Sequence, residues 1–523
     1  MTRQDWTSHR GAERFVRGTP PQGRYALGLA YANSYHVGMS SLGFQRVWDL
    51  VHRRRGWRCE RFFADGDGPP LSVESHTPLG AFAAVAFSVS FEEDYVNLLR
   101  MLRRSGIPWR RCERGPEHPL VIMGGSCAMI NPLPLQEFVD VFALGAAENL
   151  LPDILAALEE EPSNEAVAAR LAERPGFYVP SRHDPEGSDD LAKLEKLELS
   201  AEQMRMPGHL PSSAIVTPHT EFADKSLVEM SRGCPEKCRY CWATFGMGTF
   251  RWHPTELILE AAAEARATTD QIGFLATAVG DHPEVESILE EVCRMGFRAS
   301  VSSIRIPAVS EGVLRALHES GDRSITLAPE TGGDRLRALM GKPVTNAMLL
   351  EKIGMIFAAG FTQLKLYFIV GQPEESLEDV MEIAARQRML VEARRTGTIG
   401  HIHLGVNVLI PKPYTPWQRE PLADERSLRA KLRQLQREIA RLPNVSMGPV
   451  SLRQAAWQAY ISRAGGDAAE ALEAMASGEP LSAVLRRFSE QIHPEIYRRH
   501  EGDLRWHFMR AASRDAYAAL SPG

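Results

Sequence analysis

A chain of 523 residues is long enough for about three domains of ordinary size. With 44% hydrophobic and 24% charged residues, its composition is that of a soluble globular protein, and a formal net charge of -6 argues against a large nucleic-acid-binding surface. We find no apolar run of about 18 residues and no signal peptide, so we expect a cytoplasmic protein without a membrane span.

Residues 1–160 are predicted to form a Rossmann-like, doubly wound parallel sheet. Helical stripes that start at Leu42 and Tyr95 separate short apolar runs typical of buried strands, at 24–32, 82–90, 119–124 and 139–145. Alternation of strand and helix favours parallel pairing. Because ligands of such sheets bind at the carboxyl ends of the strands, the informative loops are 33–38, 88–92, 124–126 and 145–148.

Residues 161–221 are predicted to be a linker, because prolines punctuate a mostly polar stretch. A short buried strand is expected next, from Ser226 to Met230, and it opens into a loop marked by Gly233.

Three of the seven cysteines lie in this loop, with the spacing C-x3-C-x2-C: Cys234, Cys238 and Cys241. Three thiolates can hold three irons of an iron–sulfur cube, whereas electron-transfer clusters use four ligands. The open fourth iron indicates chemistry at the cluster. The alternative is a structural zinc site with His253 as its fourth ligand. The other cysteines are scattered and are interpreted as small buried hydrophobic residues: Cys59, Cys112, Cys127 and Cys293.

With Tyr240 just before the last cysteine, the spacing resembles the signature of radical S-adenosylmethionine (SAM) enzymes. In that family the open iron binds the amino and carboxylate groups of SAM, and an electron from the cluster cleaves SAM to a 5'-deoxyadenosyl radical. The resemblance implies a 4Fe-4S cluster, SAM beside Tyr240, and a partial (β/α)6 radical SAM barrel over residues 222–420. Six strand-like runs agree with it: 226–230, 271–276, 298–304, 324–328, 363–370 and 403–410.

Positions at the carboxyl ends of these strands, where barrels place their chemistry, imply the SAM contacts. Ser302 and Ser303 can bond ribose hydroxyls. Glu330 can accept from the ammonium group, and Lys342 can pair with the carboxylate. Gly371 follows the fifth strand, where the family carries a glycine near the adenine. The structural alternatives are helix capping for the serines and Glu330 and a solvated surface charge for Lys342.

The loops of the first domain resemble the cobalamin-binding domain that precedes the radical domain in a large subfamily of these enzymes. Segments 87–95 and 123–128 carry this likeness, together with the order of the domains. The glycines would let the backbone approach a flat corrin, although they are also compatible with the turns of any flavodoxin-like sheet. The resemblance implies cobalamin contacts from Tyr35, His36, Gly38, Ser88, Ser90, Gly124, Gly125, Ser126, Gly145 and Glu148.

His36 departs from the pattern Asp-x-His-x-x-Gly, through which many cobalamin domains supply a lower cobalt ligand. Ser34 stands in the place of the Asp and Met39 in the place of the Gly. We therefore expect no classical ligation of cobalt by His36. Contact with the corrin or a structural hydrogen bond are the two alternatives for this side chain.

Residues 421–523 are predicted to form a small helical domain, since apolar residues recur at helical spacing from Leu428 to Ile439 and from Leu472 to Leu485. No motif occurs in this segment. We expect it to cap the substrate side of the barrel.

The resemblance predicts a cobalamin-dependent radical SAM methyltransferase that adds a methyl group from methylcobalamin to an unactivated carbon after hydrogen abstraction. The alternative within the superfamily is a cyclisation, ring contraction or other rearrangement without methyl transfer. The alternative of another class is a non-catalytic cobalamin or redox sensor. The expected partners are a small-molecule or natural-product substrate and an external electron donor such as flavodoxin or ferredoxin, with no nucleic acid.

Overall fold

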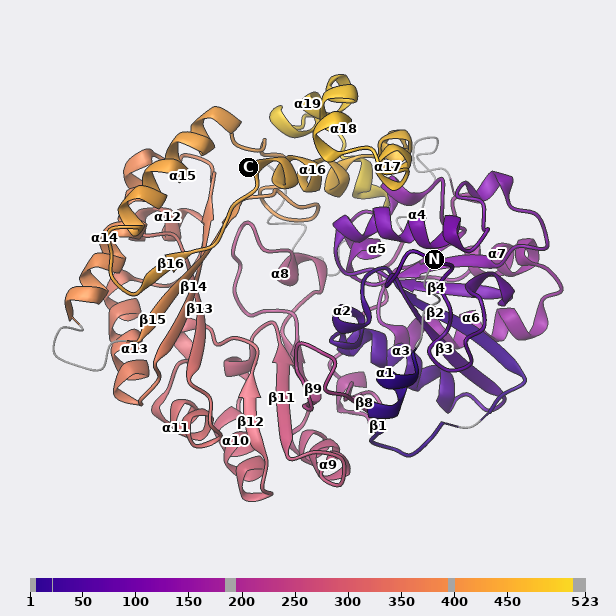
Figure 1. The fold of residues 1–523 in the computed structure, drawn as a ribbon, viewed down its shortest axis with the longest axis horizontal. Helices are drawn as coiled ribbons and strands as arrows, with labels where there is room; N and C mark the ends of the chain where they lie inside the picture. Colours follow the sequence, from indigo (N-terminus) through magenta and orange to yellow (C-terminus); the bar gives the residue numbers. More distant parts are fainter. Residues whose placement is uncertain (1–5, 21, 184–193, 394–399, 511–523) are drawn as a thin grey trace.

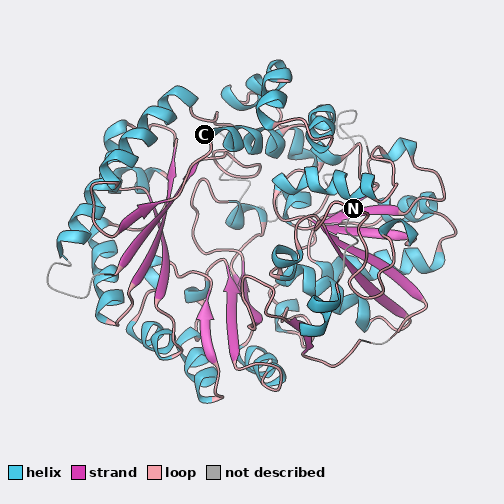
Figure 2. Ribbon diagram, viewed as in Figure 1, coloured by secondary structure: helices cyan, strands magenta, loops and turns pink. Residues whose placement is uncertain are grey.

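The computed structural model describes residues 6–20, 22–183, 194–393 and 400–510. Two α/β units lie side by side, and a group of helices spans the gap between them on one side (Figure 1). The mixed α/β class, the parallel sheets and the helical C-terminal part are confirmed. Helices cover the outer faces of the sheets in both units (Figure 2).

The first unit is a six-stranded sheet in the order β3-β2-β4-β5-β6-β7, parallel except for β7. Its strands are β2 (Tyr25–Tyr31), β3 (Trp57–Phe63), β4 (Ala84–Ser88), β5 (Leu120–Gly124), β6 (Val141–Ala143) and β7 (Phe177–Tyr178). Its helices are α1 (Thr7–Ala12), α2 (Tyr35–Met39), α3 (Leu42–Arg53), α4 (Tyr95–Arg104), α5 (Ser126–Ile130), α6 (Ala147–Glu160) and α7 (Asn164–Ala172). The doubly wound order follows the predicted alternation of strands and helices.

Strand β3 was not expected, because its sequence is charged. Arg61 is nevertheless buried, since its guanidinium donates to Glu13 at 2.7 Å and to Glu74 at 2.6 Å. Buried charges are stable when they are paired in this way. Charge pairs formed with distant residues leave no pattern in the sequence of a strand.

Part of the stretch assigned to a linker is ordered against the first unit. Helix α7 and strand β7 lie within it, and β7 pairs with β6. Further on, β8 (Ile215–Val216) pairs with β1 (Arg14–Phe15) near the chain start. Residues 184–193 of the predicted linker lie outside the described residues.

The second unit contains the six predicted parallel strands, divided between two four-stranded sheets in the orders β10-β9-β11-β12 and β13-β14-β15-β16. Its strands are β9 (Ser226–Arg232), β10 (Arg251–Trp252), β11 (Gln271–Ala276), β12 (Arg298–Val301), β13 (Ser324–Glu330), β14 (Gln363–Val370), β15 (His401–Val408) and β16 (Val445–Met447). Its helices are α8 (Trp242–Gly246), α9 (Thr255–Ala265), α10 (Val285–Arg294), α11 (Glu311–Glu319), α12 (Asp334–Leu339), α13 (Asn346–Ala358) and α14 (Leu377–Ala393). The two sheets form an open half-barrel (Figure 2).

The C-terminal part divides between the two units. Helix α15 (Glu425–Ile439) packs on α14, and β16 extends the barrel by pairing with β15. The remaining helices are α16 (Leu452–Arg463), α17 (Ala469–Ala476), α18 (Leu481–Arg487) and α19 (Ser489–Tyr497). Helix α17 contacts α4 of the first unit, so these helices bridge the two units (Figure 1).

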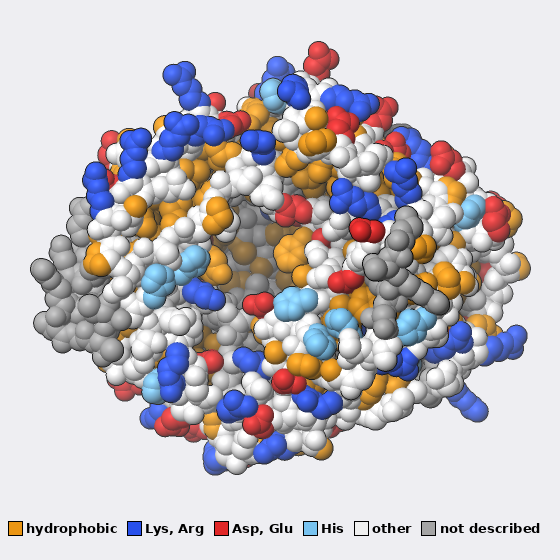
Figure 3. Space-filling view, in the orientation of Figure 1, with side chains coloured by type: hydrophobic (Ala, Val, Ile, Leu, Met, Phe, Trp, Pro, Cys, Tyr) orange, Lys and Arg blue, Asp and Glu red, His pale blue; other side chains and the backbone are white. Residues whose placement is uncertain are grey.

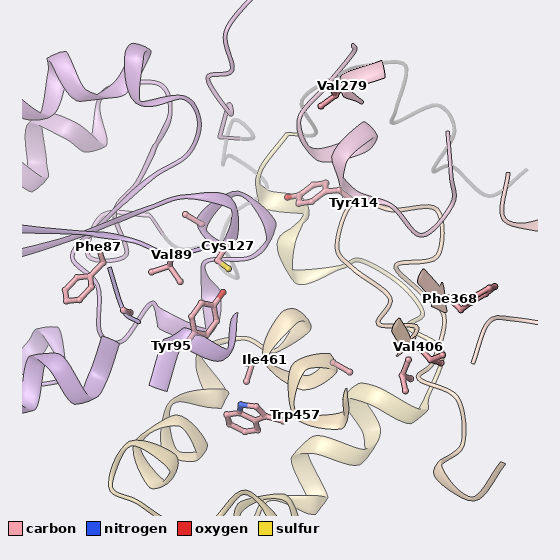
Figure 4. Close-up of a cluster of buried hydrophobic side chains, with 14 of the residues drawn as sticks. Phe87, Val89, Tyr95, Cys127, Val279, Phe368, Val406, Tyr414, Trp457 and Ile461 are labelled. Atoms are coloured by element: carbon pink, nitrogen blue, oxygen red, sulfur yellow. The ribbon is translucent and has the colours of Figure 1, made fainter. Parts of the chain in front are cut away.

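One hydrophobic core is continuous across this bridge. Phe87, Val89 and Tyr95 of the first unit belong to the same buried cluster as Trp457 and Ile461 of α16 (Figure 4). The units are therefore packed together and not merely tethered. Across the described ranges, we find no helix with both the length and the apolar character needed to pass through a bilayer.

Candidate active site

The cysteine loop begins where β9 ends. Gly233 has a φ of +73°, and a Cβ atom there would lie 2.6 Å from the carbonyl oxygens of Gly248 and Thr249. Only glycine fits this turn without strain. The turn directs the residues that follow, beginning with Cys234, away from the strand.

A cavity of about 510 Å³ lies at the carboxyl ends of the barrel strands. It brings together residues that the sequence analysis selects as cluster and SAM contacts: Cys234, Cys238, Cys241, Tyr240, Ser302, Ser303, Glu330 and Lys342. Gly371 does not line this cavity. Its N–H donates to Glu375, and a Cβ atom there would lie 2.9 Å from Leu428.

The three thiols fit a metal cluster. They are free cysteines that face one cavity, and burial raises the pKa of each of them, to about 12 for Cys238. A buried thiolate needs a cation to balance its charge, and iron supplies one. The donor set thus suits a thiolate-bound cluster. His253 is turned to other partners, since Nδ1 lies 2.8 Å from the Met204 carbonyl and Nε2 lies 3.5 Å from Glu229.

Glu330 is the centre of a hydrogen-bonded group in the cavity wall. Its Oε1 accepts from Tyr240 Oη at 2.7 Å and from Lys342 Nζ at 2.8 Å. Burial, and then the Glu330 charge, raise the pKa of Tyr240, so this phenol stays protonated and donates. Glu330 itself has a φ of +65°, which is strained for a side chain of this size and is typical of functional sites.

A second charged group in the cavity was not found from the sequence. Arg305 donates to Asp281 at 2.6 Å and also to Glu236 of the cysteine loop. Asp281 belongs to the segment after β11, so the contact ties three loops together. No local pattern marks these residues, because each comes from a different βα unit.

The first sheet has a matching edge of small polar residues. Ser88 ends β4, Gly124 ends β5, and the two are neighbours in the strand register. Ser90 and Ser126 follow them and are partly exposed, like Ser88 and Gly124. A Cβ atom on Gly124 would have no neighbour nearer than 3.9 Å, so the backbone there is open. The structure thus brings four of the predicted cobalamin contacts together.

Other predicted cobalamin contacts have partners inside the domain. Tyr35 is buried and its hydroxyl donates to Glu13 at 2.6 Å. Three glycines lie where a Cβ atom would collide with a neighbour, namely Gly38 with Phe63, Gly125 with Val89 and Gly145 with Leu197. Packing inside the domain therefore explains why tyrosine and glycine occur at these positions, and no bound ligand is needed to explain them.

Glu148 and His36 have partners of their own. Glu148 Oε1 accepts from Arg46 Nε at 2.8 Å and lies 3.8 Å from Arg232, the last residue of β9. This buried network links the first unit to the base of the cysteine loop. The His36 side chain is 54% exposed, and its Nε2 lies 3.4 Å from Glu221.

Two residues near the polar edge were missed by the sequence analysis. Phe91 is 55% exposed, which is unusual for a phenylalanine. Asp94 accepts from Asn33 at 2.8 Å, and burial raises its pKa to about 6. Perturbed carboxyls and exposed aromatic rings together are typical of ligand sites.

The carboxyl ends of the parallel strands in the two units face each other. Glu92 follows β4 and Lys412 follows β15, and their side chains form an ion pair to which Ser462 of α16 also bonds. A hollow lies between the two units (Figure 3). The cysteine cavity and the polar edge of the first sheet thus lie at strand ends that face each other.

Comparisons with known proteins agree with this architecture. Residues 43–180 match the family model for the N-terminal part of radical SAM proteins, and residues 228–386 match that of the radical SAM superfamily. An uncharacterised protein of Methanocaldococcus jannaschii is 24% identical over 398 residues, which are 75% of this chain and 79% of that protein. An uncharacterised methyltransferase of Pyrococcus horikoshii is 26% identical over 159 residues, covering 29% of this chain and 34% of its own length.

Among solved structures, the radical SAM methyltransferase TsrM of Kitasatospora setae, with cobalamin and a 4Fe-4S cluster bound, is 14% identical. It has a TM-score of 0.49 and covers 76% of this chain and 74% of that one. From the matched domains and the cysteine cavity, the protein is a radical SAM enzyme, and its radical SAM domain takes a 4Fe-4S cluster and SAM.

Proposed function

We propose that this protein is a cobalamin-dependent radical SAM methyltransferase that acts on an unactivated carbon. The observation that carries the proposal is the facing of the two strand-end edges, which the Glu92–Lys412 pair holds together. A substrate in the hollow would touch the cysteine cavity on one side and the first unit on the other. When bound, the cluster and SAM supply a radical that abstracts hydrogen, and cobalamin supplies a methyl group.

In the barrel, we assign the cluster to Cys234, Cys238 and Cys241. Glu330 and Lys342 place an acceptor and a donor 2.8 Å apart, which matches the ammonium and carboxylate of one amino-acid group. Tyr240 orients the Glu330 carboxylate by its own hydrogen bond. Ser302 and Ser303 lie in the same wall and can bond the two ribose hydroxyls.

In the first unit, we assign cobalamin to the edge formed by Ser88, Ser90, Gly124 and Ser126. The hydroxyls can bond the amide groups around a corrin, and the open backbone at Gly124 allows close approach. Phe91 offers an exposed apolar ring beside this edge. Tyr35, Gly38, Gly125, Gly145 and Glu148 would then support the edge from inside the domain, and His36 would lie at its margin.

The test is anaerobic reconstitution of the full chain with iron and sulfide, addition of hydroxocobalamin, and reaction with SAM that carries a deuterated methyl group. We expect bound corrin and a labelled methylcobalamin spectrum and mass. Binding of corrin without transfer of the label would favour a rearrangement. Formation of 5'-deoxyadenosine without any binding of corrin would contradict the methyltransferase proposal and leave the first unit as a substrate or structural module.

A further inference from the structure

The inner wall of the half-barrel is polar. Along β14 and β15, every second side chain is buried against the outer helices, as in Leu364, Leu366, Ile402 and Leu404. The alternate side chains point to the open interior, because successive residues of a strand face opposite ways. The polar residues among them are Gln363, Lys365, Tyr367, His401, His403 and Asn407, and Gly405 and Ile369 occupy the other two interior positions.

Four of the polar side chains form one row across the second sheet. In the strand register Thr326 of β13 is paired with Lys365, Lys365 with His403, and His403 with Ser446 of β16. Paired residues of neighbouring strands lie on the same face within about 5 Å. His401 stands one step along β15 on that face, where its Nε2 lies 2.7 Å from Ser446 Oγ.

Ser446 orders the two imidazoles. Its hydroxyl also lies 3.0 Å from His403 Nδ1, and it has a single proton to donate. At most one of the two histidines can therefore accept from Ser446, and at least one must donate to it. If His403 accepts, its Nε2 carries a proton and is free to donate into the interior.

Tyr367 lies over the neighbouring strand. A Cβ atom on Gly405 would stand 2.5 Å from the Tyr367 ring, so glycine is required for the ring to lie across β15. Tyr367 is 42% exposed, whereas tyrosines usually bury most of the ring and expose the hydroxyl. It presents an apolar surface next to the row of basic side chains.

This wall lines the same cavity as the cysteines, but among the described residues its basic side chains have no carboxylate partner. Thr326, Lys365 and Tyr367 line the cavity together with the three cysteines. Within the part of the chain that the structure describes, no carboxylate pairs with Lys365, His401 or His403, whereas Lys342 and Arg305 of the same cavity are both paired. Figure 3 shows histidine and basic side chains beside the hollow on the barrel side.

We infer that this wall binds an anionic group of the substrate, a carboxylate or a phosphate, between Lys365 and His403, with Tyr367 covering the adjoining apolar part. The inference rests on the proposed function, since it specifies what the enzyme acts on. A lysine ammonium without a counterion, with a histidine N–H beside it in a reaction cavity, gains from an anion, because charge-assisted hydrogen bonds are the strong ones. Substrates that are neutral or cationic throughout are thereby disfavoured.

The test measures protection of His403 from carbethoxylation by diethyl pyrocarbonate in the reconstituted full chain, mapped by peptide mass spectrometry. The probes are inorganic phosphate and succinate, each against chloride at equal ionic strength. We expect one of them to slow modification of His403 about tenfold, as one charge-assisted bond would, and the more effective probe tells phosphate from carboxylate. Exposed His493 on α19 is the internal control and should be modified at the same rate throughout.

Lys365→Met should abolish the protection. Lys352→Met, in helix α13 and outside the residues that line the cavity, should keep it. Equal modification rates with phosphate, succinate and chloride would overturn the inference. Protection by SAM alone would also overturn it, because Lys365 would then bind the cofactor's carboxylate. Production of 5'-deoxyadenosine by the same wild-type sample is measured separately. If SAM is cleaved but His403 is not protected, only this inference is refuted. If His403 is protected but SAM is not cleaved, only the proposed function is refuted.

Discussion

Lys412, four residues after β15, forms an ion pair with Glu92, four residues after β4. The side chains are 17% and 5% exposed, and Ser462 Oγ completes the group by donating to Glu92 at 2.9 Å. This pair connects the carboxyl ends of sheets in two different units with a helix of the bridge. It therefore fixes the spacing across which the proposed reaction takes place.

Lys412→Met should reduce the free energy of unfolding by about 3–5 kcal/mol, because it leaves the buried Glu92 carboxylate without its cation. Burial acts to raise the pKa of Glu92, but Lys412 and the hydrogen bonds outweigh burial and leave the pKa below its usual value. The stabilisation is accordingly present at neutral pH and is lost as the pH falls through that lowered pKa. Urea unfolding of the single and double variants, with Glu92→Gln, measures the coupling, and strict additivity would refute it.

Replacing Cys234, Cys238 or Cys241 by serine should abolish the cluster's visible absorption and reduce SAM cleavage to background. Each thiol is one of three ligands, so the loss of one opens the cluster further. The matched control is Cys112→Ser. This cysteine is exposed, so the prediction that it is buried is wrong, and it lies outside the cavity, so its replacement should leave both properties intact. Retention of cluster and activity in any of the three loop variants would refute the assignment.

Gly332→Ala should destabilise the barrel by about 1–3 kcal/mol through overpacking. A Cβ atom there would collide with the backbone of α14 at Glu382 and Ile383, which cannot move aside as a flexible side chain could. The control is Gly354→Ala in α13, where nothing lies within 4 Å and alanine should add up to about 1 kcal/mol of helix stability. The midpoints of thermal unfolding of the two variants should shift in opposite directions. Equal shifts would count against the close contact between Gly332 and helix α14.

The raised pKa of Asp94 predicts that this carboxyl destabilises the protein as the pH rises, which is opposite to the usual effect of an acidic residue. Because burial raises this pKa from 3.8 to about 6, the folded protein binds more protons than the unfolded chain between these values. Its contribution to stability therefore falls as the pH rises through this window. Asp94→Asn keeps an acceptor for Asn33 and should stabilise the protein by about 1 kcal/mol above pH 6.

The same substitution should have little effect near pH 3, where Asp94 is largely protonated in both the folded and the unfolded protein. Asp503→Asn, at an exposed position, serves as the control and should follow the wild-type pH profile. Equal effects of Asp94→Asn at both pH values, measured by thermal unfolding, would show that burial does not perturb this carboxyl.

Elements with strong periodicity could be predicted from the sequence. The strands β2, β4 and β5 coincide with apolar runs, because burial on both faces requires continuous hydrophobic residues. In the barrel, β14 and β15 bury every second side chain, and this alternation is itself a strand pattern. Strand β3 escaped because Arg61 is buried by pairing with Glu13 and Glu74. Strand β7 was not predicted, because a strand of two residues at a sheet edge has almost no sequence pattern.

The site could be predicted only where one local motif carries it. The cysteine spacing led directly to the cavity, and the serines and Glu330 could be added from the resemblance. The contacts of Arg305 with Asp281 and Glu236, and the row of Lys365 and His403, depend on strand register and loop approach. Nothing within one segment of sequence encodes such relationships, so they required the fold.

The most direct test of the account is mass spectrometry of 5'-deoxyadenosine after anaerobic reconstitution of the cluster and addition of SAM and a strong reductant. We predict that wild-type protein forms 5'-deoxyadenosine and methionine, and that formation depends on the reductant and on each of the three loop cysteines. A fully reconstituted cluster with no 5'-deoxyadenosine would contradict radical chemistry at this cavity and would favour a sensor over an enzyme.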